Sequence, residues 1–127
     1  MKKLLLTLFI LYTTVSIFTQ DPGERITGFW KNDNKTVKIE VTKDEGIYSG
    51  KIIWVDDKVA KKGNPTLLGT TILSDLKYSD NKWTGSVYVP QKSKSFDCSV
   101  TLDGNDTLLL EVTKGFFSRT KRWTRVK

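Results

Sequence analysis

The segment over residues 36–41 alternates apolar and charged side chains. Val37, Ile39 and Val41 share one face, and the residues between them are charged. A period of two is typical of a β-strand that buries one face. A turn that contains glycine follows, and then comes an apolar run over residues 47–55. The pattern predicts a hairpin of two antiparallel strands.

The rest of the chain repeats this pattern of short apolar runs and polar turns. A polar connection over residues 56–65 comes first, and the segment 67–79 fits either two short strands or a strand and a turn. Further strands are predicted over residues 82–89, 95–102, 107–112 and 118–126.

No segment shows a helical stripe, so an all-β fold of about seven or eight short strands is predicted, either a sandwich or a barrel. The consecutive short turns favour a small antiparallel up-and-down barrel. Closing such a sheet removes its exposed edges.

The N-terminus has the pattern of a secretory signal peptide. Lys2 and Lys3 precede an uncharged, largely apolar run over residues 4–20. A basic head followed by an apolar stretch is typical of export signals. The run approaches the roughly 17–25 residues that span a bilayer, so an uncleaved anchor remains an alternative.

The boundaries that we expect divide the chain into a signal peptide over residues 1–20, cleaved near Thr19 or Gln20, and a barrel domain over residues 21–127. The domain is then exported, either to the periplasm or to the outside of the cell. No stable membrane span remains after cleavage.

The composition excludes several kinds of chemistry. The chain contains no histidine, which rules out Ser–His–Asp and Cys–His catalysis and zinc sites built on histidine. Cys98 is the sole cysteine, so neither an internal disulfide nor a thiolate metal site can form. It lies between Phe96 and Val100 on an apolar face, where a buried and unreactive thiol is expected. We predict no metal and no cofactor.

The chain is basic, with a net charge of +7 that falls to +5 without Lys2 and Lys3. Such a charge attracts anionic ligands, glycans, lipid surfaces or nucleic acid, but it also serves solubility. Because the charges are spread along the chain, solubility is the favoured interpretation.

The last predicted strand has an unusual polar face. A period of two places Arg119, Lys121, Trp123 and Arg125 on one side of it. Such a face could bind phosphates. The simpler interpretation is an edge strand that charge protects against aggregation.

Two short motifs resemble the calycin superfamily, which includes the lipocalins and fatty-acid-binding proteins. They are GFW at residues 28–30 and RWTRV at residues 122–126. The resemblance implies that Gly28 and Trp30 begin the barrel and that Arg125 covers Trp30 to close one end. A guanidinium over an indole face is favourable by roughly 0.5–2 kcal/mol.

A closer resemblance covers residues 26–127. The elements that carry it, in order, are GFW, IYSGKIIW, LLG, KWTGSVYVP, the SF at 95–96 and the terminal WTRV. Together they resemble the small exported bacterial proteins of domain of unknown function 2147. The chain departs from that family at Val89 and Ser93, where an aspartate and a nearby glycine are usual. The resemblance implies a fold and export, and it implies no activity.

These observations favour a lipocalin-like protein that binds a small apolar or amphipathic ligand in the cell envelope. Alternatives are an envelope enzyme that uses Asp56 or Asp57 with a lysine, and a barrel without a cavity that acts through its basic surface on glycans, lipids or proteins. Nucleic acid is not an expected partner of an exported protein, and the oligomeric state is left open. The aromatic residues expected to line or flank the ligand pocket are Tyr48, Trp54, Trp83, Tyr88 and Phe96.

Overall fold

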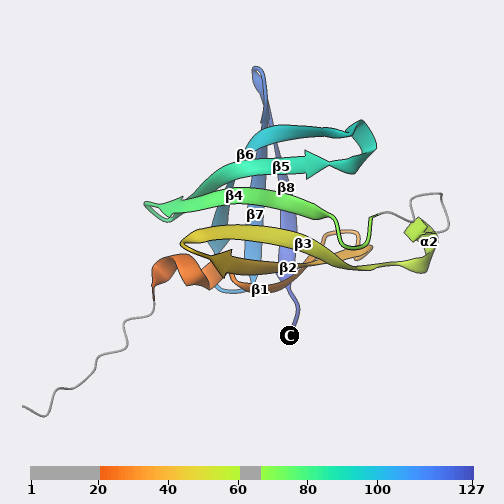
Figure 1. Cartoon of the computed structure of the whole chain (residues 1–127), viewed down its shortest axis with the longest axis horizontal. Coiled ribbons are helices and arrows are strands. Elements are labelled where there is room, and N and C mark those ends of the chain that lie inside the picture. The colour runs from red at the N-terminus through yellow and green to blue at the C-terminus, as the bar shows by residue number, and fades with distance from the viewer. Residues whose placement is uncertain (1–20, 61–66) are drawn as a thin grey trace, which may run out of the picture.

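The computed structural model describes residues 21–60 and 67–127, which form a closed antiparallel β-barrel (Figure 1). Each strand pairs with the next along the chain, and the first pairs with the last. The all-β, up-and-down architecture predicted from the alternating pattern is confirmed. The eight strands are β1 (Gly28–Asn32), β2 (Val37–Asp44), β3 (Ile47–Val55), β4 (Thr71–Ser79), β5 (Lys82–Val89), β6 (Lys94–Asp103), β7 (Thr107–Lys114) and β8 (Phe117–Arg125).

Among the described residues, three short helical turns lie outside the strands. They are η1 (Pro22–Ile26), α2 (Asp57–Ala60) and η2 (Pro90–Lys92). The described part of the polar connection after β3 therefore contains a turn of helix. The ambiguous segment 67–79 contains a single strand, β4. The expected signal peptide at 1–20 and residues 61–66 lie outside the described residues.

The barrel is closed by a short ladder between its first and last strands. Trp30 pairs with Arg125, and Asn32 pairs with Trp123. The first part of β8, residues 117–122, pairs with β7 alone. In Figure 1 the β7–β8 hairpin consequently runs past the other strands and projects at the top of the view. The barrel is thus tightly closed at the end that carries η1 and looser at the opposite end.

The inward-facing side chains fill the half of the barrel near η1. Among the largest fully buried side chains are Trp30, Trp83 and Tyr48. Cys98 is also buried, and desolvation raises the pKa of its thiol to about 11. At neutral pH this thiol is therefore protonated and packs as a small apolar group.

A bulge in β4 requires a glycine at residue 85 of the neighbouring strand, β5. The register between β4 and β5 shifts between Ser74 and Lys77, and Asp75 takes a left-handed φ of +56°. A Cβ atom on Gly85 would lie 2.6 Å from the Ser74 carbonyl oxygen and 2.7 Å from that of Asp75. Only glycine fits against this irregular backbone, because any side chain would clash with it.

The turn η1 covers the filled end of the barrel. Ile26 is fully buried there. The Trp30 indole donates its Nε1–H to the Ile26 carbonyl at 2.9 Å, and the Trp83 indole donates to the Gly23 carbonyl at 3.0 Å. Two tryptophans from opposite sides of the barrel therefore satisfy backbone carbonyls of η1 that would otherwise be buried without partners.

Arg125 fastens the same end of the barrel. Its guanidinium carbon lies 4.2 Å from the centroid of the Trp30 ring. Its three nitrogens donate to carbonyl oxygens, with distances of 2.7 Å to Asn105, 3.0 Å to Thr27 and 2.7 Å to Arg25. One side chain thus joins β8, the β6–β7 turn and the residues on either side of Ile26.

Gly28 leaves the space that this arginine needs. It has a φ of +127°, and a Cβ at this position would lie 2.8 Å from Nη1 of Arg125. A larger residue would suffer both backbone strain and a clash. The contact between Trp30 and a basic residue of the last strand, expected from the calycin resemblance, is present in the structure.

Candidate functional site

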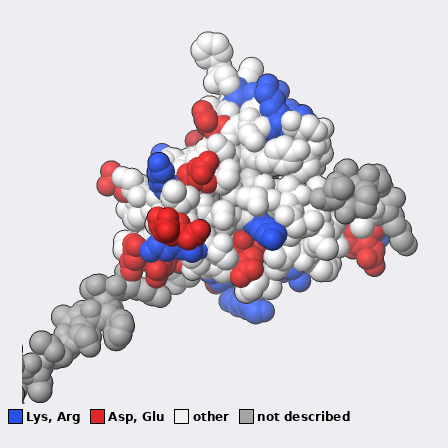
Figure 2. Space-filling view, viewed as in Figure 1, with Lys and Arg blue, Asp and Glu red and all other residues white. Residues whose placement is uncertain are grey.

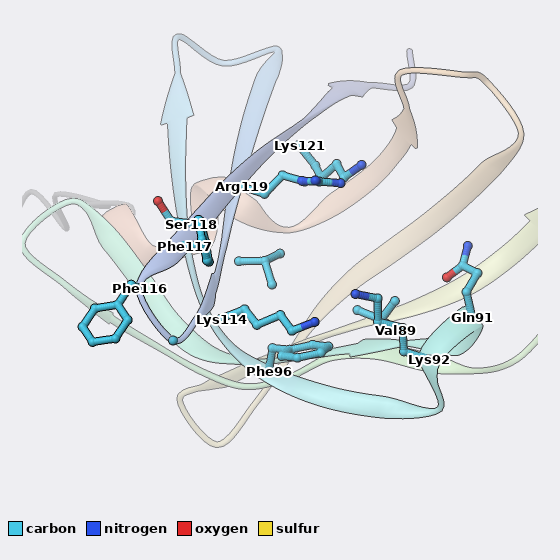
Figure 3. Close-up of a pocket in the computed structure, with 12 residues that line it drawn as sticks. Val89, Gln91, Lys92, Phe96, Lys114, Phe116, Phe117, Ser118, Arg119 and Lys121 are labelled. Carbon is cyan, nitrogen blue, oxygen red and sulfur yellow. The ribbon is translucent and has the colours of Figure 1, made fainter.

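The open end of the barrel contains a cavity of about 930 Å³. Its wall comes from the ends of β5, β6, β7 and β8, together with η2 and the β7–β8 turn (Figure 3). This volume lies near the upper end of the roughly 300–1,000 Å³ that is typical of ligand pockets. The residues that line it are Val89, Gln91, Lys92, Phe96, Val112, Lys114, Gly115, Phe116, Phe117, Ser118, Arg119 and Lys121.

The apolar part of the wall follows from strand alternation. Val89 continues the inward face of Trp83 and Val87 on β5, and Phe96 continues the inward face of Cys98 on β6. Successive side chains of a strand point to opposite faces, so each of these residues extends the core toward the mouth. The cavity therefore has a hydrophobic wall that is continuous with the packed interior.

The charged part of the wall is basic. Lys92, Lys114, Arg119 and Lys121 line the cavity, and no Asp or Glu does so among the described residues. In Figure 3, Lys114 extends over Phe96, while Arg119 and Lys121 come from β8. Cations from separate segments thus share one cavity, where their field is focused by the low-dielectric wall.

Three of the lysines of this end surround Phe96. The Nζ atoms of Lys92, Lys94 and Lys114 lie 5.9, 5.8 and 5.8 Å from the centroid of its ring. The Lys114 side chain beside Lys92 lowers the pKa of Lys92 below its usual value. Like charges held this close repel one another, and a bound anion would relieve that repulsion.

The sequence indicated that one face of β8 carries cations, but it did not indicate that this face lines a cavity. Arg119 pairs with Val112 and Lys121 with Leu110, on the same face as Trp123. Over residues 117–122 the strand is an edge, as its charge indicated. Its charged side chains nevertheless line the cavity, so edge protection alone does not account for them.

The five aromatic residues expected to line a pocket lie in three different places. Phe96 lines the cavity. Tyr48 and Trp83 are packed in the filled core, and burial raises the pKa of Tyr48. Trp54 is 39% exposed, with Lys38 Nζ 4.8 Å from its ring centroid, and Tyr88 is half-buried. Neither of these two lines the cavity.

We did not predict from the sequence that the four cations of the cavity lie together. They come from η2, from the last residue of β7 and from two alternate positions of β8. The useful signal was the alternation of Arg119 and Lys121 on the face of Trp123, which marks an inward-facing position. The contribution of Lys92 and Lys114 depends on how the two turns meet in space.

The acidic residues considered for catalysis lie elsewhere. Asp57 begins α2 and Asp56 precedes it, and neither lines the cavity. Within residues 21–60 and 67–127, no group of three or more His, Cys, Asp or Glu side chains is placed to hold a metal ion. Across the same residues, no helix has the length and apolar character to cross a membrane.

Comparisons with known proteins agree with this architecture. Residues 28–125 match the family described as "Uncharacterized protein conserved in bacteria (DUF2147)". A search of curated proteins gives no match. Among solved structures, the chain is similar to protein HP1028 from Helicobacter pylori, described as belonging to the lipocalin family. The TM-score is 0.63 at 19% sequence identity, over 80% of this chain and 83% of that one. At this identity the likeness supports the fold alone.

Proposed function

This chain belongs to the DUF2147 family of uncharacterized bacterial proteins, and we propose that it is an exported lipocalin-like carrier of single-chain amphipathic anions. The ligand class is a carboxylate or phosphate head on an alkyl tail. Export rests on the basic and apolar leader at residues 1–20. A lipocalin-like barrel with an open mouth suits a small ligand.

The observation that carries this proposal is the basic cluster over Phe96. Three ammonium groups lie within 5.9 Å of the centroid of that ring. Arg119 and Lys121 add two further cations to the cavity wall. Charge-assisted hydrogen bonds to a carboxylate or phosphate are roughly twice as strong as neutral ones. An anionic head therefore gains more from this site than a neutral or cationic head.

The apolar wall of the cavity favours a ligand that carries an alkyl tail behind its anionic head. Val89, Phe96 and Val112 lie beside the cations in one cavity. Burial of apolar surface contributes roughly 25 cal/mol per Å². A small inorganic anion would leave this wall in contact with water, whereas an alkyl tail would cover it. The site thus favours an amphiphile over either a free anion or a neutral oil.

Neutralising two of the cavity cations should weaken this binding. We expect the variant Lys114→Gln/Arg119→Gln to bind decanoate at least roughly tenfold more weakly than the natural chain, because both lost cations face the head group. The affinity is measured by isothermal titration calorimetry at low ionic strength and near neutral pH, with decanoate below the concentration at which it forms micelles. Added salt should weaken binding to the natural chain.

The matched control removes the same charge elsewhere. Lys51 and Lys82 are exposed residues of β3 and β5 that do not line the cavity. The variant Lys51→Gln/Lys82→Gln should bind decanoate nearly as well as the natural chain. Binding of decyltrimethylammonium as tight as that of decanoate would contradict the proposal. An equal loss of affinity in the two double variants would do so as well, since it would reflect net charge alone.

A further inference from the structure

The tip of the β7–β8 hairpin exposes two adjacent phenylalanines. Phe116 is fully exposed and Phe117 is 80% exposed. In Figure 3 the Phe116 ring points away from the cavity. At the top of Figure 2 an uncharged tip projects beyond a group of Lys and Arg side chains. Hairpin turns are usually built from small and polar residues, so two exposed phenylalanines are unusual at this position.

The other hairpins of the same barrel show the usual pattern. The β2–β3 turn contains Glu45 and Gly46, and the β4–β5 turn contains Asp80 and Asn81. The β6–β7 turn, Gly104 to Asp106, is equally polar. These three turns lie at the end covered by η1. The β1–β2 turn lies at the open end, as the β7–β8 turn does, and it too is polar, with Asp33, Asn34 and Lys35. The two phenylalanines are therefore a local feature of the β7–β8 hairpin and do not reflect generally apolar turns.

The surroundings of the tip are basic. Asp97 and Glu111 are acidic residues of the adjoining strand segments, and they pair with Thr113 and Thr120. The basic residues of the same segments are more numerous. They are Lys92, Lys94, Lys114, Arg119, Lys121 and Arg122.

We propose that this hairpin docks the protein onto an anionic lipid bilayer, with Phe116 and Phe117 in the headgroup region and the flanking cations against the lipid phosphates. Exposed aromatic side chains beside clustered lysine and arginine are a combination that binds anionic membrane surfaces. Each basic residue close to such a surface strengthens binding roughly fivefold.

The size of the apolar tip favours a bilayer over a protein partner. Two phenylalanines offer roughly 300–500 Å² of surface, whereas a stable protein interface buries about 800 Å² on each side. A bilayer needs no complementary shape, and its anionic headgroups match the cations of the tip. A second copy of this chain would bring the same cations together and would be repelled.

Docking in this way would hold the mouth of the cavity at the lipid surface, because Phe116 and Phe117 also lie along its rim. The inference does not depend on the proposed ligand. It rests on the exposure of the two rings and on the charge around them, and both features would remain if the cavity bound something else.

The test is co-sedimentation of the exported protein with two kinds of vesicle. One is phosphatidylcholine alone, and the other is an equal mixture of phosphatidylcholine and phosphatidylglycerol. The natural chain should bind the anionic vesicles and bind the neutral ones much more weakly. The variant Phe116→Ser/Phe117→Ser should lose roughly tenfold or more of its affinity for the anionic vesicles, because two apolar rings no longer leave water.

The matched control is Phe29→Ser/Ile53→Ser, which removes two side chains that are 43% and 40% exposed on β1 and β3. This variant should bind the anionic vesicles as the natural chain does. The circular dichroism spectra of all variants should agree, since every altered side chain is exposed. Unchanged vesicle binding by the hairpin variant would overturn the inference. Concentration-dependent dimers of the natural chain that disappear in the hairpin variant would also overturn it, because the occupant of the tip would then be a second copy.

Discussion

Replacing Trp30 with alanine is expected to destabilise the barrel by about 4 kcal/mol. Trp30 is fully buried, and its indole holds the Ile26 carbonyl at 2.9 Å. The substitution removes both a large packed ring and the donor that fastens η1. For a domain of this size the loss corresponds to a fall in Tm of roughly 15–25 °C, measured by thermal unfolding followed by circular dichroism.

The control for this variant is the same substitution at Trp54. Its ring is 39% exposed and lies beside Lys38 on the outside of β3. We expect a loss of about 1 kcal/mol or less there, since little packed surface disappears. Similar losses for Trp30→Ala and Trp54→Ala would mean that the indole of Trp30 does not close the barrel.

Replacing Arg125 with alanine is expected to cost about 2–3 kcal/mol, with a fall in Tm of roughly 10–15 °C. The side chain donates to three carbonyl oxygens and covers the Trp30 ring at 4.2 Å. Its loss removes the side-chain contacts that tie η1 and the β6–β7 turn to β8, whereas the backbone hydrogen bond from Arg125 to Asp106 remains. Urea unfolding at equilibrium measures the change in the free energy of unfolding.

Two further variants separate charge from geometry at this position. Arg125→Lys keeps the charge but loses the planar fork that reaches three carbonyls, so its stability should lie between those of the natural chain and Arg125→Ala. Arg122→Ala removes an exposed arginine of the same strand and should change stability by about 0.5 kcal/mol or less. An Arg125→Ala variant as stable as Arg122→Ala would contradict the role assigned to this contact.

The fold was predictable because it depends on a local signal. Val37, Ile39 and Val41 alternate with polar residues, and Phe96, Cys98 and Val100 alternate in the same way. Each such strand reports its own buried face, and short turns leave few ways to connect the strands. The contact of Trp30 with Arg125, where β1 pairs with β8, was implied by the resemblance of two short motifs to the calycins.

Irregular backbone was harder to predict from the residues alone. Gly85 lies against the bulge of β4 at Asp75, and the residues of β5 alone do not indicate where that bulge lies. The segment 67–79 was ambiguous for the same reason, because a bulge interrupts the period of two. Such features depend on the partner strand, which a single segment does not report.

The candidate site was only partly predictable. Phe96 was expected at a pocket and lies there, whereas Tyr48 and Trp83 fill the core instead. An aromatic residue on an inward face has the same local pattern whether it fills a core or lines a cavity. The two cases differ in how far along the barrel axis the residue lies, and that distance depends on the strand register. The cluster of Lys92 with Lys114 likewise joins two turns that are far apart in the sequence.

The most direct test of the proposed binding site is a crystal structure of the protein with ω-bromodecanoate, whose bromine marks the end of the alkyl tail by anomalous scattering. The account predicts that the carboxylate lies within hydrogen-bonding distance of Lys114 or Arg119 and that the bromine lies inside the cavity against its apolar wall. A probe bound to the outer surface of the barrel, or one whose carboxylate faces away from these cations, would contradict it.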